Sequence, residues 1–418
     1  MKTDEVYLGT VATITMGTSP KGETYNNQGV GLPLLNGPTE FGITHPTCTL
    51  FTTDSKKECQ TGDLIFCVRG STTGRMNWAD KPYSLGRGVC SIRGKNLADT
   101  KFIRYCIELK LDALLNLSGG ATFPNLTRDD ITNFPIPYPI YRQKTTAILS
   151  AYNDLIENNT RRIKILEEMA QTLYHEWFVK FRFPGHKHTK MADSELGLIP
   201  EGWEVRKLGD ITKVISGFAF KSKDFQDEGI PVIKIKNIRT GTVDISDIQC
   251  VNSSFLSLNS KYHVKRGDLL ISLTGSHLTQ PNSVVGRVAV YSQSKKVCLL
   301  NQRAGKIFIT NSDRCKISYL FYLLSSEDKR RSIALMASGA ASQANISPTQ
   351  VESLNLLIPR TEILNLFHQI ISPIFEQISN LEIKNSNLRK TRDLLLPKLI
   401  SGEIDVERLE ITTEDIAA

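Results

Sequence analysis

The sequence contains no run of about 18 or more apolar residues, the length that a membrane-spanning helix needs. Residues 1–9 carry charges and no apolar stretch, so they do not resemble a secretory signal peptide. None of the eight cysteines forms a C-x-x-C pair, which excludes a zinc ribbon and a thioredoxin-like motif. We therefore expect a cytoplasmic protein with free, mostly buried thiols.

The chain also lacks the motifs of common enzymes. Residues 88–96 resemble a phosphate-binding loop but have the wrong spacing and the wrong last residue, and Gly29 and Gly31 lack the third glycine of a dinucleotide fingerprint. There is no Asn-Pro-Pro-aromatic tetrapeptide of an adenine methyltransferase, no G-x-S-x-G elbow and no H-E-x-x-H helix. Glu108 and Lys110 form an E-x-K, as nuclease motifs do, but so short a pattern is frequent by chance. We predict a binding function without catalysis.

The composition is that of an ordinary globular protein. The 418 residues are 40% hydrophobic and 22% charged, and the net charge is +8. This length suits two or three domains of roughly 100–200 residues each. A modest positive excess permits a polyanionic partner such as nucleic acid without requiring one.

The two halves of the chain repeat one another in order, which indicates an internal duplication. The repeated blocks are Leu8-Gly9 with Leu208-Gly209, Gly17 with Gly217, Gly62-Asp63 with Gly267-Asp268, Gly74-Arg75 with Gly286-Arg287, Arg87 with Arg303, and residues 118–127 with residues 338–347. The separation grows from about 200 to about 220 residues along the chain, as insertions in the loops of the second copy would cause.

Each copy is predicted to be an α+β domain rich in short strands. Runs of β-branched residues alternate with turns that contain Gly and Ser. Near the end of each copy a short helix is expected: Thr127 can cap the first with Asp130 three residues later, and Ser347 precedes Pro348 in the second. A strand-like run that leads into a proline follows each helix.

A long helix is predicted after each copy, because apolar residues recur at alternating spacings of four and three, as in a coiled coil. The predicted inter-helix seam consists of Ile148, Tyr152, Leu155, Leu166, Met169 and Leu173 in the first helix and Phe367, Ile371, Ile374, Ile378, Leu381, Leu388 and Leu395 in the second. We expect the two helices to pack against each other. Pro373 should kink or start the second helix, and Pro397 should end it.

Four polar residues interrupt this predicted seam: Asn159, Arg162, Asn385 and Arg392. Such residues commonly fix the register and the pairing of a coiled coil at a cost in stability. Alternatively, they lie at solvated ends of the seam. The sequence alone favours neither interpretation.

These patterns define six predicted segments: a first domain (1–142), a central long helix (143–182), a linker (183–204), a second domain (205–360), a distal long helix (361–401) and an acidic tail (402–418). The linker is rich in Pro, Gly and polar residues. Its His186 and His188 could suggest a metal site, but two histidines in a basic stretch are usually solvated. We expect no metal in this chain.

Four segments resemble the DNA-specificity (S) subunit of Type I restriction-modification enzymes, and the resemblance covers nearly the whole chain. They are ILSAYNDLIENN (148–159), MAQTLYHEWFV (169–179), GLIPEGWEV (197–205) and RDLLLPKLISGE (392–403). One feature departs from the family. Many relatives carry Glu-Gln before each long helix, whereas this chain has Arg142-Gln143 and Thr361-Glu362, which makes the start of the distal helix less certain.

The resemblance implies two target-recognition domains at opposite ends of an antiparallel helix pair, each of which reads half of a split, asymmetric site in double-stranded DNA. It implies docking to two modification subunits, which carry S-adenosylmethionine and methylate adenine. Restriction subunits that use ATP and Mg²⁺ can join them, and no cofactor is expected in this chain. A helix of roughly 35 residues spans about 50 Å, so the helices could set the spacing between the half-sites.

DNA contacts are expected from loops that carry basic, hydroxyl and amide side chains, which bind phosphates and base edges. The candidates are Arg69, Ser71, Thr72, Arg75, Lys221, Lys223, Thr274, Ser276, Gln343 and Asn345, with His277 in the same loop as Ser276. Each of them could instead be a solvated or turn-stabilising residue.

Two alternative functions are compatible with the sequence. A stand-alone DNA-binding regulator would bind DNA without a partner subunit. A coiled-coil protein scaffold would show no salt-dependent affinity for DNA.

Overall fold

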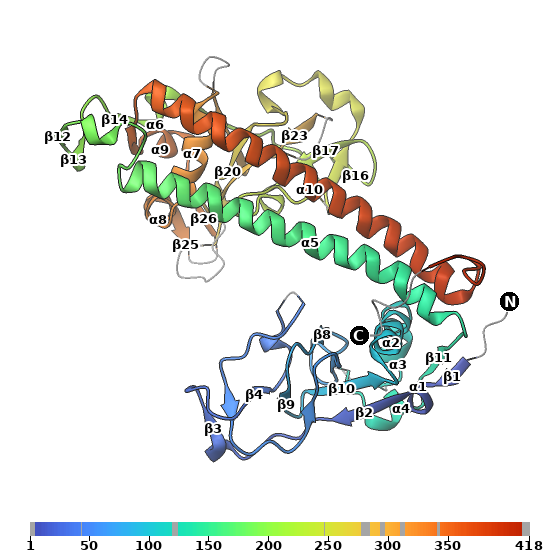
Figure 1. Ribbon diagram of the computed structural model, residues 1–418. Helices are drawn as coiled ribbons and strands as arrows, with labels where there is room; N and C mark the ends of the chain where they lie inside the picture. The colour runs from blue at the N-terminus through green and yellow to red at the C-terminus, as the bar shows by residue number, and fades with distance from the viewer. Residues whose placement is uncertain are drawn as a thin grey trace. The chain divides into compact units, whose positions relative to one another are not determined.

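The structure is a computed structural model that describes residues 5–42, 44–118, 124–245, 247–276, 285–292, 297–309, 314–340 and 343–411 (Figure 1). Internal contacts divide the chain into two compact units. Unit 1 comprises Met1–Asn158 and Ser386–Ala418, and unit 2 comprises Asn159–Asn385. Both boundaries fall inside the long helices α5 (Arg142–Tyr174) and α10 (Thr361–Ser401), so each helix contributes one segment to each unit.

The first domain lies in unit 1 and contains mostly short strands. Its strands are β1 (Glu5–Tyr7), β2 (Ala12–Met16), β3 (Tyr25–Asn26), β4 (Leu32–Leu35), β5 (Phe51–Thr52), β6 (Glu58–Cys59), β7 (Leu64–Cys67), β8 (Met76–Trp78), β9 (Tyr83–Leu85), β10 (Val89–Gly94) and β11 (Pro135–Pro137). Its helices are α1 (Leu8–Val11), α2 (Leu97–Leu109), α3 (Leu111–Asn116) and α4 (Arg128–Thr132).

The second domain lies in unit 2 and has a similar order of elements. Its strands are β14 (Glu204–Lys207), β15 (Lys213–Ser216), β16 (Phe225–Gln226), β17 (Ile230–Ile233), β18 (Gln249–Val251), β19 (His263–Val264), β20 (Leu269–Ser272), β21 (Thr274–Gly275), β22 (Val288–Val290), β23 (Cys298–Leu300), β24 (Ala304–Phe308), β25 (Ser338–Ala340), β26 (Gln343–Asn345) and β27 (Asn355–Ile358). Its helices are α6 (Leu208–Ile211), α7 (Lys316–Ser325), α8 (Glu327–Met336) and α9 (Pro348–Glu352).

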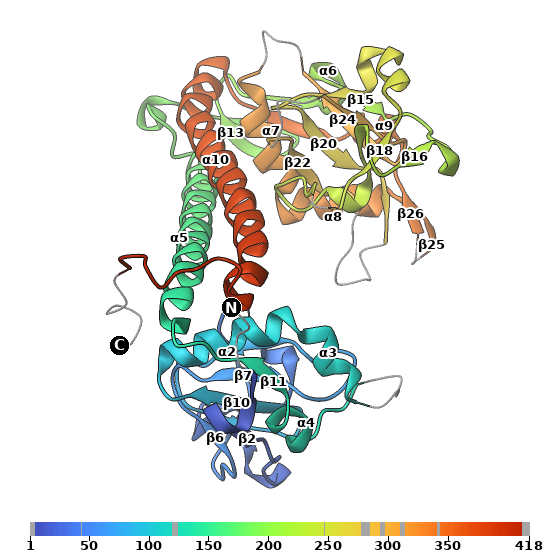
Figure 2. The same cartoon turned by 90° about the vertical axis from the view of Figure 1, so that its right-hand side faces the viewer.

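The sheets of the two domains have the same strand order, which confirms the internal duplication. The four-stranded sheet is β2-β10-β7-β8 in the first domain and β15-β24-β20-β22 in the second. The five-stranded sheet is β3-β5-β4-β9-β6 in the first and β16-β18-β17-β23-β19 in the second. Each domain also has a two-stranded sheet, β1-β11 or β14-β27, and the second domain has in addition the three-stranded sheet β21-β26-β25. In Figure 2, α2 lies across β7 and β10, and α7 lies beside β22.

Matched residues hold equivalent turns in both copies. Gly62 and Gly267 have φ values of 87° and 89°, which favour glycine over residues with a Cβ. The next residue in each copy, Asp63 or Asp268, accepts a hydrogen bond of 2.9 Å from the backbone three residues earlier. The recurrence of Gly-Asp in the sequence therefore reflects one turn that is built twice.

The predicted capped helices are also confirmed. Thr127 and Asp130 form a reciprocal capping box at α4, and Ser347 and Gln350 form another at α9, where Pro348 is the first helical residue. Residues 119–123 and 341–342, which belong to the same repeated block, lie outside the described residues. All eight cysteines are free thiols, and six of them are buried. Burial raises the pKa of Cys59 to about 12.

The helices α5 and α10 pair within each unit. In unit 2, Asn159 contacts Asn385, while the rings of Tyr174 and Phe367 lie 6.5 Å apart, so the helices run antiparallel. In unit 1, Arg392 donates a hydrogen bond of 2.7 Å to the side-chain oxygen of Asn153. The expected start of the distal helix at residue 361 agrees with α10.

The polar residues of the predicted seam divide between the two interpretations. Asn159 donates a hydrogen bond of 2.9 Å to Asn385, and both side chains are buried. Asn385 in turn donates to the hydroxyl of Thr160 at 3.3 Å. Arg162 is exposed, although it lies inside α5 and not at an end of the helix. The asparagines thus form a buried polar pair in the helix interface.

The predicted seam is in the wrong phase on part of α5. Leu155 and Met169 are 51% and 56% exposed, whereas Ile156 and Ala170, one residue later, are buried. The periodicity of the larger apolar residues predicted that Leu155 and Met169 face the partner helix. In the structure the small Ala170 lies on the packed face of α5 instead. The other predicted residues are at least partly buried: Ile148, Tyr152, Leu166 and Leu173 on α5 and Phe367, Ile371, Ile374, Ile378, Leu381, Leu388 and Leu395 on α10.

The structure bears differently on the two prolines of α10. The helix starts twelve residues before Pro373, so Pro373 does not start it, and the expectation that Pro397 ends the helix was wrong, because the helix continues to Ser401. A proline removes one intrahelical hydrogen bond, but the buried side chains on both sides, such as Ile371 and Leu399, hold the helix in place. The helix ends at Gly402, which has a φ of 77°.

The expected linker and tail are more ordered than predicted. Residues 183–204 include the hairpin β12 (Met191–Ser194) and β13 (Gly197–Pro200), and Phe183, Ile199 and Trp203 are buried in the unit 2 core. Val406 is buried in the unit 1 core, so the acidic segment does not leave the domain directly after α10. Among the residues that the structure describes, no helix combines the length and apolar composition that crossing a membrane requires.

Candidate nucleic-acid interface

In the first domain, the loop between β7 and β8 lies beside the segment that precedes α4. Arg69 pairs with Asn125 in an antiparallel bridge, and the backbone of Leu126 donates a hydrogen bond of 3.0 Å to the carbonyl of Val68. The hydroxyl of Thr73 donates to the carbonyl of Pro124 at 2.8 Å. The fold therefore joins two segments that are more than 50 residues apart into one surface.

The second domain joins the equivalent segments in the same way. β21 pairs with β26, so that Thr274 lies opposite Asn345, and Ile346 donates to the carbonyl of Leu273 at 2.9 Å. Thr274 thus occupies the position of Arg69, and Asn345 that of Asn125. The connection from β20 to β22 spans residues 273–287, whereas that from β7 to β8 spans only residues 68–75.

The candidates of the first domain are accessible to a ligand. Arg69, Ser71 and Arg75 are exposed, and Thr72 is half-buried. Gly70 and Gly74 have φ values of 91° and 94° and form the corners of this loop. Its two guanidinium groups and hydroxyls are of the kind that binds phosphates and base edges.

The candidates of the second domain differ from one another in their exposure to solvent. Asn345 is exposed, but Thr274 is 7% exposed and donates its hydroxyl to the side-chain oxygen of Asn345 at 2.8 Å. Thr274 therefore orients the amide of Asn345 instead of presenting its own hydroxyl. Ser276 is half-buried, and Gln343 begins β26. His277 lies outside the described residues.

Lys221 and Lys223 are on a different part of the second domain. Both are exposed and lie at the short helix η5 (Ser222–Asp224), which leads into β16 of the five-stranded sheet. Among the residues described, no hydrogen bond or ion pair links them to the loop that contains Thr274. Lys21 occupies the position of Lys221 in the first copy, before η1 (Gly22–Thr24).

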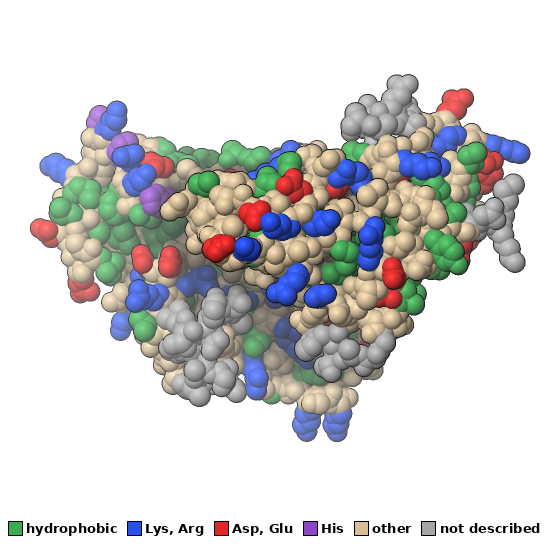
Figure 3. Space-filling view, turned by 90° about the horizontal axis from the view of Figure 1, so that it is seen from below, with side chains coloured by type: hydrophobic (Ala, Val, Ile, Leu, Met, Phe, Trp, Pro, Cys, Tyr) green, Lys and Arg blue, Asp and Glu red, His purple; other side chains and the backbone are tan. Residues whose placement is uncertain are grey.

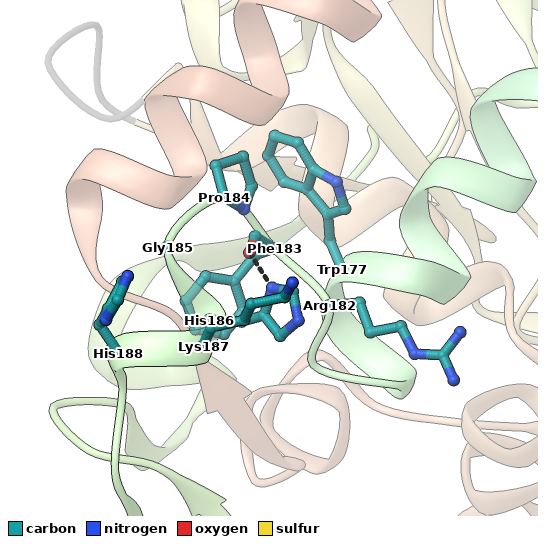
Figure 4. A pocket seen from close by; sticks show the side chains of 8 residues that line it. All are labelled: Trp177, Arg182, Phe183, Pro184, Gly185, His186, Lys187 and His188. Carbon is teal, nitrogen blue, oxygen red and sulfur yellow. Dashed lines mark hydrogen bonds between the residues drawn. The ribbon is translucent and has the colours of Figure 1, made fainter.

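A pocket of about 400 Å³ in unit 2 contains the two histidines of the predicted linker (Figure 4). Its walls are Trp177, Arg182, Phe183, Pro184, Gly185, His186, Lys187 and His188. His186 is hydrogen-bonded through Nδ1 to the carbonyl of Phe183 at 2.8 Å, and the rings of His186 and His188 do not converge in Figure 4. Within the described part of the chain, no group of three His, Cys, Asp or Glu side chains could hold a metal ion.

Charges of both signs are mixed on the surface shown in Figure 3. Lys and Arg side chains alternate with acidic and polar ones, and no continuous field of one sign covers this face. At the end where β12 and β13 lie, hydrophobic side chains are exposed next to His, Lys and Arg; Met191 and Leu198 are 48% and 60% exposed. This face therefore offers no broad surface of one charge to a polyanion.

The sequence matches the family described as the Type I restriction modification DNA specificity domain over residues 2–168 and again over residues 200–391. The chain belongs to this family. The two matched segments coincide with the two structural copies, and each includes the loop and the pre-helix segment described above.

This chain is similar over most of its length to named specificity subunits. It is 29% identical over 373 residues to the Type I restriction enzyme MjaIX specificity subunit of Methanocaldococcus jannaschii, covering 84% of this chain and 81% of that protein. It is 23% identical to the EcoKI specificity subunit of Escherichia coli, covering 81% and 73%. The crystal structure of an S subunit from M. genitalium has the same fold, with a TM-score of 0.62 at 16% identity and coverage of 95% and 96%.

Sequence reasoning missed two residues that lie at the candidate interface. Asn125 pairs with Arg69 as Asn345 pairs with Thr274, and the matched block around residue 125 was a signal that could have identified it. Arg287 immediately precedes β22, and its pKa is lowered by burial and by the nearby positive charges of Arg330 and Arg239. These three arginines are far apart in the sequence, so no local pattern indicated their proximity.

Proposed function

We propose that this chain is the DNA-specificity subunit of a Type I restriction-modification enzyme, and that each domain recognises one half of a split, asymmetric DNA site. The observation that carries the proposal is one frame built twice with different loops at equivalent positions. Thr274 of the second domain occupies the position of Arg69, and the loop that ends at Arg287 spans residues 273–287, whereas the loop that ends at Arg75 spans residues 68–75.

The difference between the loops matters because base edges are distinguished by the donors and acceptors that face them. Arg pairs well with guanine, and Asn or Gln pairs with adenine, while hydroxyls and backbone amides position the phosphates. Two domains with the same frame but different loop side chains should therefore prefer different sequences. A site read by such a pair is asymmetric although the protein has an internal repeat.

The long helices carry exposed apolar side chains that support docking of modification subunits. Ile165 and Met169 on α5 are 49% and 56% exposed, and Leu366 and Ile370 on α10 are 42% and 45% exposed. Each pair is four residues apart and therefore shares one helix face. Partner helices commonly cover such stripes. The S-adenosylmethionine would be held by those modification subunits, and ATP and Mg²⁺ by restriction subunits, in the cytoplasm where the DNA lies.

The lengths of α5 and α10 support a role in setting the half-site spacing. The helices contain 33 and 41 residues, which correspond to about 50 and about 60 Å at roughly 1.5 Å per residue. B-DNA has a helical repeat of roughly 34–36 Å, so a helix of this length spans on the order of a turn and a half.

The proposal is tested by removing the positive charges of the first loop. In the full chain, Arg69→Ala and Arg75→Ala should each weaken binding to duplex DNA and reduce the slope of log affinity against log salt by about one for each phosphate that is no longer neutralised. Fluorescence anisotropy at several KCl concentrations measures both quantities. Lys95→Ala, at an exposed turn outside the loop, is the matched control and should change neither.

The possible outcomes separate the proposal from its alternatives. Binding by both Arg variants that equals the wild type at every salt concentration would contradict the role of the loop. A wild-type chain without salt-dependent affinity for DNA would instead indicate a protein scaffold. Full sequence-specific binding and regulation without any modification subunit would indicate a stand-alone regulator.

A further inference from the structure

Asn345 lies in the middle strand of a small sheet at the edge of the second domain (Figure 2). The sheet has the order β21-β26-β25, and Asn345 on β26 pairs with Thr274 on β21 and with Ser338 on β25. Directly opposite residues of an antiparallel pair share one face of a sheet. The amide of Asn345 therefore lies in a row between two hydroxyl side chains.

The side chain of Asn345 is on the open face of this sheet. Asn345 is exposed, whereas its neighbours Ala344 and Ile346 are buried. Such an alternation is typical of a strand with one face packed on the domain and the other in contact with solvent. A ligand that approaches the open face can therefore reach the amide directly.

Thr274 restricts the orientation of this amide. The nearly buried Thr274 donates its hydroxyl to Oδ1 of Asn345 at 2.8 Å. This bond leaves Oδ1 its second lone pair and does not use the hydrogens of Nδ2. The amide therefore keeps an acceptor and a donor for a ligand. Because it is held in one orientation before binding, the entropy cost of a contact is lower.

An adjacent donor and acceptor of this kind match one base better than the others. In the major groove, adenine presents N7 as an acceptor and its N6 amino group as a donor, and the amide of Asn or Gln pairs with both. Guanine presents two acceptors there, so Oδ1 of the amide would face another oxygen. The oriented amide of Asn345 is therefore suited to adenine.

The first domain has a different partner at the same place. Asn125 matches Asn345, but the residue opposite it is Arg69, which is exposed. Ser118, which matches Ser338 in the repeated block, donates its hydroxyl to a backbone carbonyl of α3 at 2.7 Å. A hydroxyl that holds the asparagine is therefore not required by the frame that the two domains share.

We propose that Asn345 recognises an adenine in the half-site of the second domain, and that Thr274 is a positioning residue that acts on the DNA only through the amide it holds. This inference rests on the proposed DNA-recognition function and adds the identity of a base. The adenine is one that the modification subunit does not methylate. A base under methylation leaves the stack of the duplex, and it would lose a contact in the major groove.

The test maps methylated adenines in cells that express the full chain with its modification subunit. In the wild type, one half-site should contain an unmethylated A·T base pair that Asn345→Ala no longer distinguishes, while every other position is kept. Discrimination at this base pair should fall on the order of 10- to 100-fold, the usual effect of one bidentate base contact. Asn355→Ala is the matched control, since it removes another exposed amide, on β27, and should leave the motif unchanged.

The role of Thr274 is tested through its hydroxyl. Thr274→Val keeps the shape of the side chain but removes the donor, so the preference for adenine should fall about two- to tenfold, the range of one neutral hydrogen bond. Thr274→Ser restores the hydroxyl and should restore the preference. A Thr274→Val variant with the full preference of the wild type would overturn the positioning role.

A binding measurement makes the test independent of methylation. 7-Deazaadenine lacks the N7 acceptor but still pairs with thymine, and it is placed at each unmethylated adenine of the wild-type half-site in turn. At one position it should weaken binding by the wild-type chain about tenfold, measured by fluorescence anisotropy. Asn345→Ala should bind this duplex and the unmodified duplex equally. This comparison decides if the variant no longer supports methylation.

Three results would overturn the proposal. The first is an Asn345→Ala variant with the motif and the 7-deazaadenine sensitivity of the wild type. The second is relaxation at a G·C base pair, or a half-site without an unmethylated A·T base pair. The third is relaxation in both half-sites, because the effect would then be a general loss of affinity. A wild type that produces no bipartite motif would reject the proposed function itself, before any variant is compared.

Discussion

The two domains share the same arrangement of strands, turns and capped helices but differ in the residues and the length of their loops. Both have the same order of strands in two sheets, the same Gly-Asp turn and the same capped helix before the last strand. They differ in the connection between two matched strands of the four-stranded sheet, which spans residues 68–75 in one copy and residues 273–287 in the other. The shared residues named here hold turns and helix ends, whereas the two connections differ in length and composition.

The two units also differ in how α5 and α10 are joined. In unit 2 an aromatic cluster surrounds Phe367, whose ring centroid lies 4.8 Å from that of Phe178 and 5.8 Å from that of Trp177. In unit 1 the contacts are aliphatic and polar, such as the hydrogen bond between Arg392 and Asn153 and the buried Leu149 and Leu399. One pair of helices therefore has two chemically different ends.

The largest effect is expected from breaking the aromatic end. Phe367→Ala removes a fully buried ring and should destabilise unit 2 by about 3–5 kcal/mol, because it leaves a cavity among aromatic side chains. Hydrogen-exchange mass spectrometry should show faster exchange in residues 159–385 and little change in the first domain. The neighbouring Leu366→Ala is the control, since Leu366 is 42% exposed. Equal effects of both variants would contradict the importance of this cluster.

Smaller losses of stability, equal in the two domains, are expected when matched glycines of the shared frame are replaced by alanine. A Cβ on Gly17 would collide with the carbonyl oxygen of Gly86, and one on Gly217 with that of Leu300. Gly17→Ala and Gly217→Ala should each cost about 1–3 kcal/mol, measured by urea unfolding, because the backbone must move to make room. Gly22→Ala, where the space is open, should be nearly neutral. A large cost in one copy and none in the other would show that the frame is not equivalent.

The smallest effect concerns the buried pair of Asn159 and Asn385. Asn159→Leu removes one hydrogen bond of Asn385, which keeps its bond to Thr160, and should cost about 0.5–1.5 kcal/mol. The double variant, with Leu at both positions, should recover much of this loss, because two leucines can pack against each other and leave no buried amide without a hydrogen-bond partner. Thermal unfolding of Asn159→Leu, Asn385→Leu and the double variant measures the coupling. A double variant that is less stable than the sum of two single changes would mean that the amides contribute more than their mutual hydrogen bond.

The sequence predicted the features that depend on local pattern or on repetition. The presence of the long helix α10, the capping boxes at Thr127 and Ser347, and the duplicated turns were visible in the residues themselves. The phase of α5 was wrong at Leu155 and Met169, because the packed face there contains the small Ala170. The hairpin β12–β13 was missed, since its buried Ile199 and the nearby Trp203 are anchored by contacts with distant residues.

The candidate interface was predicted only in part for the same reason. Loop residues such as Arg69 and Arg75 stand out in the sequence because basic and hydroxyl residues are adjacent there. The pairing of Arg69 with Asn125 and the meeting of Arg239, Arg287 and Arg330 depend on the fold, which joins segments that are distant in the chain. A single sequence gives no sign of such proximity.

The most direct test of two domains that read two half-sites is to co-express the chain with its modification subunit and map the methylated adenines in the host DNA. The account predicts a bipartite motif with two dissimilar halves and a fixed spacer. It further predicts that insertion of about one turn into both α5 and α10 changes only the spacer. A single uninterrupted motif, a palindromic one, or an unchanged spacer in the lengthened protein would contradict it.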